Sequence, residues 1–217
     1  HHDCPHPDTI TAQYGLSKED YVLYLARIVP EKGLHYLIEA FQQVKTHKRL
    51  IIAGGIDWDD AYCQKVSKMA AEDSRITMVG LVRGREWAEL FGNCYLYVLP
   101  SDIEGMPMSL LEALSFGRRC LVSDIDENVE AGKGCVSLFQ HSNVEDLRQK
   151  LQFLIDNPQE GLSTGGDANW EDWDTVTRQT LELYHKVLSP GYKPTHCEDR
   201  KRWREEREKE AVEHAGQ

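Results

Sequence analysis

The chain has 217 residues, 41% of them hydrophobic and 28% charged, with a formal net charge of −11 at pH 7. This length suits one α/β domain with appendages, and the acidic balance argues against a surface that binds nucleic acid through its phosphates. No apolar run approaches the roughly 20 residues of a membrane span, and no signal-peptide pattern opens the sequence.

Six cysteines stand at positions 4, 63, 94, 120, 135 and 197, without any C-x-x-C pair. Cys94, Cys120 and Cys135 lie in or beside apolar runs, so we expect them to act as small core residues. An even number of cysteines leaves disulfides open, but this spacing is typical of a reduced cytosolic protein. We therefore expect a cytoplasmic location.

Apolar runs of strand length alternate with helical patterns along most of the chain. The runs are residues 21–26, 50–53, 76–79, 95–99, 119–122 and 134–139, and the helical patterns are 34–45, 61–72, 85–91, 110–116 and 147–155. Near-continuous apolar strands are typical of a parallel sheet covered on both faces. The alternation predicts an α/β fold of Rossmann type, a parallel sheet with helices on both faces.

The chain divides into four segments by composition. Residues 1–19 carry His and Cys without metal-ligand spacing, and we interpret them as a linker or a cloning remnant. Residues 20–160 are the expected Rossmann-like domain. Residues 161–188 contain a Gly/Ser/Thr-rich break and then a helical pattern, and residues 189–217 are a tail rich in both charge signs.

The stretch 100–117 organises the expected site. Pro100 ends a buried strand because it has no amide for a ladder, and a loop with Gly105 leads into a helix that stops at Gly117. Open α/β sheets bind ligands at such strand ends, and the amides of a helix N-terminus attract anions. Two carboxylates, Glu104 and Glu112, flank this point.

Loops after the other strands add cations and glycines to the same edge. Arg27 and Lys32 follow the first strand, where they are either anion ligands or ordinary surface charges. Gly54 follows the second strand and either allows close approach of a ligand or makes a plain turn. The third strand leads into a loop over residues 80–83.

The segment E-G-x-P-x-x-L-L-E-A, which begins at Glu104, resembles the signature of retaining nucleotide-sugar glycosyltransferases of family 4, the group 1 glycosyl transferases. The segment R-x-x-x-x-K-G at Arg27 resembles a second element of this family. The resemblance covers roughly residues 20–188. It implies the C-terminal, donor-binding half of a GT-B fold, which has two Rossmann-like domains facing each other across a cleft.

The resemblance also implies a role for each matched residue. Two cations clamp the donor diphosphate and one glutamate faces the transferred sugar. A second glutamate binds the ribose, and two loops contact the base. These residues are Arg27, Lys32, Gly105, Met106 and Met108 for the diphosphate, Glu104 for catalysis, Glu112 for the ribose, and Gly54, Leu81 and Val82 for the base. Residues 123–128, S-D-I-x-E-N, resemble a segment that lies under the donor sugar.

The expected activity is retaining transfer of a hexose from a nucleoside diphosphate sugar, without a bound metal or other cofactor, as in polysaccharide biosynthesis. The acceptor site belongs to an N-terminal domain that no residue here matches. We therefore expect this chain alone to be inactive, and any membrane contact to come through that missing half.

Three alternatives stay open at this point. Ser109-x-x-Glu112 fits a capping box, in which the glutamate would bond the helix N-terminus instead of a ribose. A nucleotide-sugar epimerase on the same fold would share the donor motifs. A non-catalytic nucleotide-sugar-binding module that pairs with another subunit would share them as well.

Overall fold

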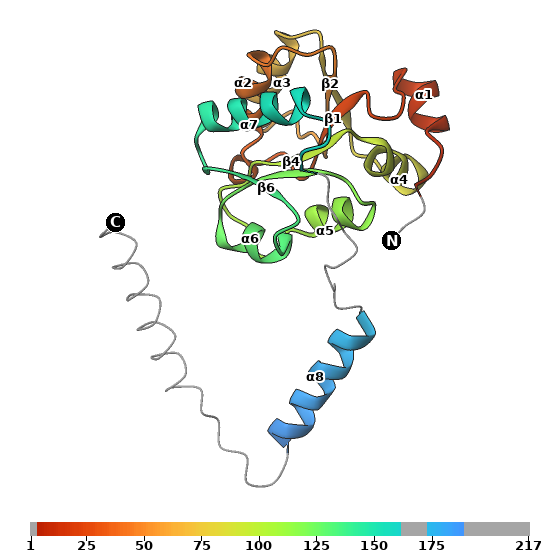
Figure 1. The fold of residues 1–217 in the computed structure, drawn as a ribbon, viewed down its shortest axis with the longest axis vertical. Helices are drawn as coiled ribbons and strands as arrows, with labels where there is room; N and C mark the ends of the chain where they lie inside the picture. The colour runs from red at the N-terminus through yellow and green to blue at the C-terminus, as the bar shows by residue number, and fades with distance from the viewer. Residues whose placement is uncertain (1–3, 162–172, 189–217) are drawn as a thin grey trace, which may run out of the picture. The chain divides into compact units, whose positions relative to one another are not determined.

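The computed structural model describes residues 4–161 and 173–188 (Figure 1). The chain divides after Ala168 into two compact units. The first unit holds the α/β fold. In the second, the described residues form one helix, α8, Trp173–Leu188. The charged tail expected over residues 189–217 lies outside the described residues.

A sheet of six parallel strands forms the centre of the first unit. The strands are β1 Tyr21–Leu25, β2 Arg49–Ala53, β3 Ile76–Gly80, β4 Leu96–Leu99, β5 Cys120–Ser123 and β6 Ser137–Phe139. Their order in the sheet is β3-β2-β1-β4-β5-β6, so the chain winds outward in both directions from the boundary between β1 and β4. This is the doubly wound Rossmann arrangement, and the prediction of a Rossmann-like α/β fold is confirmed.

Helices cover both faces of this sheet (Figure 1). The α-helices of the first unit are α1 Asp8–Tyr14, α2 Leu34–Gln42, α3 Ala61–Ala71, α4 Gly84–Asn93, α5 Met108–Ser115, α6 Asp126–Gly132 and α7 Val144–Asp156, and a 3-10 turn, η1, spans Pro30–Lys32. Helices α3, α2 and α7 pack side by side on one face, whereas α4, α5 and α6 follow one another on the other.

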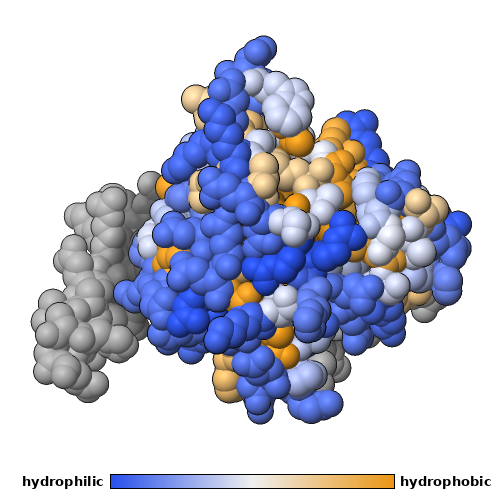
Figure 2. Space-filling model, turned by 90° about the horizontal axis from the view of Figure 1, so that it is seen from above, coloured by the Kyte–Doolittle hydropathy of each residue, from blue (hydrophilic) through white to orange (hydrophobic). Residues whose placement is uncertain are grey.

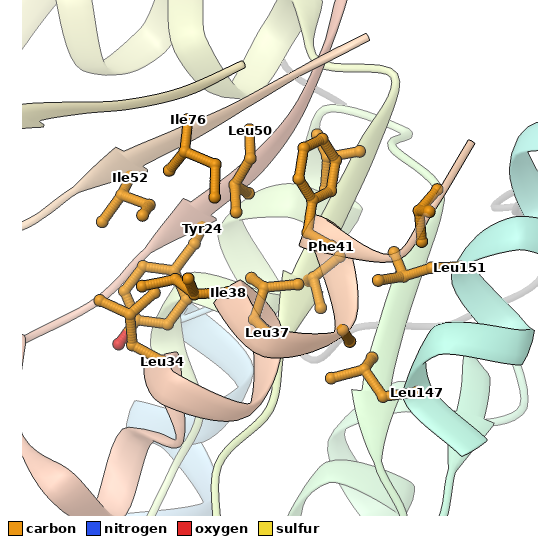
Figure 3. Close-up of a cluster of buried hydrophobic side chains, with 14 of the residues drawn as sticks. Tyr24, Leu34, Leu37, Ile38, Phe41, Leu50, Ile52, Ile76, Leu147 and Leu151 are labelled. Atoms are coloured by element: carbon orange, nitrogen blue, oxygen red, sulfur yellow. The ribbon is translucent and has the colours of Figure 1, made fainter. Parts of the chain in front are cut away.

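Helix α2 packs its apolar side on the sheet and on α7 (Figure 3). Leu34, Leu37, Ile38 and Phe41 recur at helical spacing and are fully buried. They meet strand residues such as Tyr24, Leu50, Ile52 and Ile76, together with Leu147 and Leu151 of α7. Because the opposite strand face is also covered, through ring contacts of Phe91 with Tyr97 and Phe116, both sides of the central strands are apolar. The protein surface seen in Figure 2 is mostly hydrophilic, with apolar side chains in separate patches.

The segment expected to be a linker, residues 1–19, is packed against the domain over its described part. Ile10 of α1 and Leu16 are fully buried, and α1 lies beside α4 (Figure 1). The Glu89 carboxylate, also fully buried, accepts hydrogen bonds from the backbone amides of Thr9 at 2.7 Å and Ile10 at 3.0 Å. The long-range partner Glu89 thus anchors a segment whose own sequence has no strong helical pattern.

Two smaller expectations differ from the structure. Cys94 and Cys120 are buried core residues as expected, but Cys135 is only half-buried. Cys63 is a further buried cysteine. Helix α6 lies between β5 and β6, where no helix was expected. Cys197 lies outside the described residues. Within residues 4–161 and 173–188, none of the helices is both long and apolar enough to cross a membrane.

Candidate functional site

Two loops meet at the carboxyl ends of β1 and β4, where the strand order reverses. Gly33, with a φ of +64°, closes η1 directly above Pro100, and a Cβ there would lie 1.9 Å from the Pro100 carbonyl oxygen. The Asp102 amide donates a hydrogen bond to the Glu31 carbonyl oxygen at 2.9 Å. In doubly wound sheets this switch point is where ligands bind.

A buried ion pair joins the two loops. Lys32 Nζ lies 2.7 Å from Glu104 Oε2, and their side chains are only 12% and 5% exposed. The Ser101 hydroxyl donates to the other carboxylate oxygen, Glu104 Oε1, at 2.7 Å. Each oxygen of this carboxylate therefore has a donor, as a buried charge requires. The structure brings the expected diphosphate cation and the expected catalytic carboxylate into direct contact.

A chain of buried hydrogen bonds supports Ser101 from behind. The Ser123 hydroxyl donates to the Ser101 carbonyl oxygen at 2.5 Å, and Asn128 Nδ2 donates to Ser123 Oγ at 2.9 Å. Ser101, Ser123 and Asn128 are all fully buried. The sequence motif S-D-I-x-E-N marked this segment, but its supporting role for the Glu104 loop depends on a contact between β4 and β5 that no local pattern shows.

Arg27 is placed differently from Lys32. Its side chain is 74% exposed, and Nη2 lies 3.8 Å from Glu31 Oε1, which is a weak surface pair. Its backbone is held more firmly, because the Tyr24 hydroxyl donates to the Arg27 carbonyl oxygen at 3.0 Å. Burial raises the pKa of Tyr24 well above its usual value, which keeps this hydroxyl protonated as a donor. Arg27 thus presents an exposed, weakly paired cation on a hydrogen-bonded backbone.

Glu112 does not form the capping box that its spacing allows. Helix α5 begins at Met108 after Pro107, and no side chain caps it. The Ser109 hydroxyl instead accepts a hydrogen bond from the Tyr97 hydroxyl at 2.8 Å. Burial raises the pKa of the half-buried Glu112 carboxyl, an effect that its side-chain hydrogen bond with Trp87 opposes. Because Pro107 is the N-cap and the Ser109 hydroxyl does not cap the helix, the capping-box alternative is wrong. The Glu112 carboxylate therefore has no capping role in α5.

The loop between Glu104 and α5 presents both apolar side chains and backbone amides. Gly105, Met106 and Met108 are exposed. The Met108 amide already donates to the Met106 carbonyl oxygen at 2.8 Å, whereas the amides of Gly105 and Met106 make no hydrogen bond within the described part of the chain. Of the three expected diphosphate-binding backbone groups, two are therefore available as donors.

The residues expected near a base lie at the ends of β2 and β3. Gly54 donates its amide to the Gly80 carbonyl oxygen at 2.8 Å, and a Cβ on Gly54 would lie 2.3 Å from the Ala26 carbonyl oxygen. Position 54 therefore requires glycine, because the backbone at the end of β1 leaves no room for a side chain. Leu81 is exposed, but Val82 is buried, so only the backbone of Val82 can face a ligand.

The site has no metal-binding cluster in the part of the chain that the structure describes. There, no three side chains of the His, Cys, Asp and Glu types are grouped closely enough to hold an ion. The absence of a metal in the reaction stays a prediction.

Comparisons with known proteins place this geometry in a family. The profile of the family described as "Glycosyl transferases group 1" matches residues 8–165. An N,N'-diacetylbacillosaminyl-diphospho-undecaprenol alpha-1,3-N-acetylgalactosaminyltransferase from Campylobacter jejuni is 27% identical over 80% of this chain and 46% of its own length. The O-antigen chain mannosyltransferase B of Escherichia coli is 24% identical over 81% of this chain and 48% of its own. The chain thus spans about half the length of these curated relatives.

Solved structures share the fold at low sequence identity. The Anabaena protein HepE in complex with UDP and glucose superposes with a TM-score of 0.73 at 18% identity, covering 82% of this chain and 51% of HepE. A sucrose-phosphate synthase from Thermosynechococcus elongatus has a TM-score of 0.71 at 20% identity, over 83% of this chain and 49% of its own.

Proposed function

The chain belongs to the group 1 glycosyl transferases, and from this we propose that it binds a nucleoside diphosphate sugar and acts as the donor half of a retaining sugar transfer. The observation that carries the proposal is the Lys32–Glu104 pair at the switch point of the sheet. It joins a cation suited to the diphosphate and a carboxylate suited to the sugar. HepE, whose fold is similar, is described in complex with UDP and glucose, which supports a nucleotide sugar as the ligand.

The diphosphate would lie over Lys32, Arg27 and the start of α5. When the bond between sugar and phosphate breaks, the departing nucleoside diphosphate gains negative charge, and fixed cations stabilise it in the transition state. An ammonium group has three N–H donors, so Lys32 can hold Glu104 with one and phosphate oxygens with the others. The unbonded amides of Gly105 and Met106 add donors beside the first turn of α5. Arg27 can swing from Glu31 to the phosphates because its side chain is exposed.

Glu104 would act on the sugar side of the same pair. Its charge is fixed by Lys32 and Ser101, so it can accept hydrogen bonds from sugar hydroxyls and face the positive charge that develops on the transferred carbon. Glu112 would accept hydrogen bonds from the ribose hydroxyls. The base would contact Gly54, Leu81 and the backbone of Val82. We propose that no metal takes part.

The acceptor site would come from an N-terminal domain that these 217 residues do not include. The curated relatives are about twice as long as the region they share with this chain, which supports a second domain in the active enzyme. We propose that this chain binds the donor by itself but transfers the sugar only when that domain is joined to it.

Isothermal titration calorimetry of the 217-residue chain tests the donor site. The ligands are UDP, UDP-glucose, GDP and GDP-mannose, and the variant pair is Lys32→Met against Lys68→Met, an exposed lysine on α3. We expect at least one nucleotide to bind the wild type and the Lys68 variant alike, and to bind the Lys32 variant more weakly. Absence of binding by every nucleotide would refute the proposed function.

A further inference from the structure

Asp102 lies between Ser101 and Glu104 in the loop after β4 and makes three hydrogen bonds, each to a different segment of the chain. Its amide donates to the Glu31 carbonyl oxygen of η1 at 2.9 Å. Its two carboxylate oxygens accept from hydroxyls: Oδ2 from Tyr36 of α2 at 3.3 Å and Oδ1 from Ser142, before α7, at 2.7 Å. One residue thus ties together the carboxyl-side loops of β1, β4 and β6.

The contacts of Asp102 connect the two segments that carry the ion pair. Lys32 belongs to η1, and Glu104 follows Asp102 by two residues in the loop after β4. The distance between the ammonium group and the carboxylate depends on how η1 and that loop are held against each other. The Asp102 amide makes the direct link, and the Asp102 carboxylate fixes the loop to α2 and to the residues before α7.

Ser142 gives an independent sign that this arrangement is specified. Its φ is +58°, in the left-handed region that residues other than glycine rarely adopt. The surrounding structure must compensate for such a conformation, and residues held in this way concentrate at functional sites. Here the hydroxyl of this strained residue donates the shorter of the two side-chain hydrogen bonds to Asp102.

We propose that Asp102 is a positioning residue for the donor site: through Tyr36 and Ser142 it sets the loop that carries Glu104 against η1, which carries Lys32. This inference rests on the proposed function, since it concerns the same donor site. Asp102 would act through these contacts within the protein, since each of its carboxylate oxygens accepts a hydrogen bond from a hydroxyl of another segment.

The test measures UDP affinity by isothermal titration calorimetry and Tm by scanning calorimetry for Asp102→Ala and Asp102→Asn; if the wild type binds GDP and not UDP, GDP replaces UDP in every arm. An asparagine side chain has an oxygen acceptor and an NH₂ donor, so it can still bond both hydroxyls, whereas alanine bonds neither. Asp146→Ala is the matched control. Asp146 is a half-buried carboxylate whose Oδ2 accepts from the Gln140 amide at 2.7 Å, so it holds the same β6–α7 loop without touching η1 or the Glu104 loop.

We expect Asp102→Ala to weaken UDP binding about tenfold, because misplaced binding groups lose much of their effect even when all are present. Asp102→Asn should restore the affinity to within about threefold of the wild type, since it rebuilds the hydrogen bonds without the charge. Asp146→Ala should bind UDP like the wild type, even if its Tm falls as far as that of Asp102→Ala.

Ser142→Gly gives a second measurement that does not depend on the folding of the alanine variant. Glycine adopts a positive φ without strain, so Tm should stay within about 2 °C of the wild type, while loss of the hydroxyl weakens UDP binding by about threefold. A merely structural role for Ser142 would leave the affinity unchanged.

Each other outcome overturns the inference. Equal UDP affinity in the wild type, Asp102→Ala and Ser142→Gly would show that the junction does not position the site. Equal loss in Asp102→Ala and Asp102→Asn would mean that the charge itself is needed, and tighter binding in both would mean that Asp102 only repels phosphate. If the wild type binds UDP and the variants do not follow the expected order, only this inference fails. If the wild type binds no nucleotide, the proposed function fails first.

Discussion

Replacing Lys32 separates the structural role of the ion pair from its role in binding. In Lys32→Met, the Glu104 carboxylate stays only 5% exposed and keeps just the Ser101 hydroxyl as a donor among the described residues. Removing one partner of a buried pair typically costs about 3–5 kcal/mol, and the partial exposure of Lys32 places the cost near 3. At this chain length each kcal/mol shifts Tm by about 2–4 °C, so we expect a fall of about 6–12 °C.

The double variant Lys32→Met with Glu104→Gln distinguishes the two roles. It leaves no charge buried at this pair, and a neutral amide costs less to bury than an unpaired carboxylate, so Tm should recover most of the loss seen in Lys32→Met. UDP affinity should stay low, because the cation that faces the phosphates is still missing. Loss of a hydrogen bond to a charged group costs about 1.5–3 kcal/mol, which is about 10- to 150-fold in affinity.

Scanning calorimetry and titration with UDP, on the wild type, both variants and Lys68→Met, check this prediction. A Lys32→Met protein with unchanged Tm would show that the pair is not buried in solution. A double variant that binds UDP as tightly as the wild type would remove Lys32 from the diphosphate site.

Three further predictions concern single residues at the site and at the N-terminal segment. Glu112→Gln should lower UDP affinity about fivefold, because a neutral acceptor bonds the ribose hydroxyls less strongly than a charged one, and it should not lower Tm, since no capping box is lost; a lower Tm with normal affinity would contradict this role. Gly33→Ala should unfold at a clearly lower temperature, because its Cβ would lie 1.9 Å from the Pro100 carbonyl oxygen at a φ of +64°; a Tm equal to that of the wild type would show that the two loops are not in contact. Burial alone would raise the pKa of Glu89, but hydrogen bonds from Ile10, Arg85 and Thr9 lower it below its usual value, so its contribution to stability is present above pH about 4.5 and is lost as the pH falls through the lowered value. Glu89→Gln should therefore flatten the fall of Tm in acid, and identical acid profiles for the two proteins would refute this contribution.

Most of the sheet could be predicted from sequence because its strands are buried on both faces. Runs such as residues 50–53 and 95–99 are apolar throughout, which distinguishes them from the amphipathic helices between them. Helix α1 could not be predicted in the same way. It is seven residues long, and its packing depends on Glu89, which is distant in sequence. Helix α6 is equally short and begins soon after the end of β5, so the sequence shows no helical pattern there.

The members of the site could be predicted from motif spacing, but their contacts could not. Both Lys32 and Glu104 stood out in the sequence, whereas their pairing at 2.7 Å depends on the adjacency of β1 and β4. Ser109-x-x-Glu112 has the spacing of a capping box, yet helix α5 begins at Met108 with Pro107 in the N-cap position, and the buried Tyr97 hydroxyl donates a hydrogen bond to Ser109. No sequence pattern marks Asp102, since its three partners, Glu31, Tyr36 and Ser142, all lie far from it in the sequence.

A crystal structure of the 217-residue chain with bound UDP tests the central proposal most directly. We predict the diphosphate at the carboxyl ends of β1 and β4, within hydrogen-bonding distance of Lys32 Nζ and of the amides of Gly105 and Met106, with the ribose hydroxyls on Glu112. UDP bound at any other edge of the sheet, or with its phosphates away from Lys32, would contradict the account.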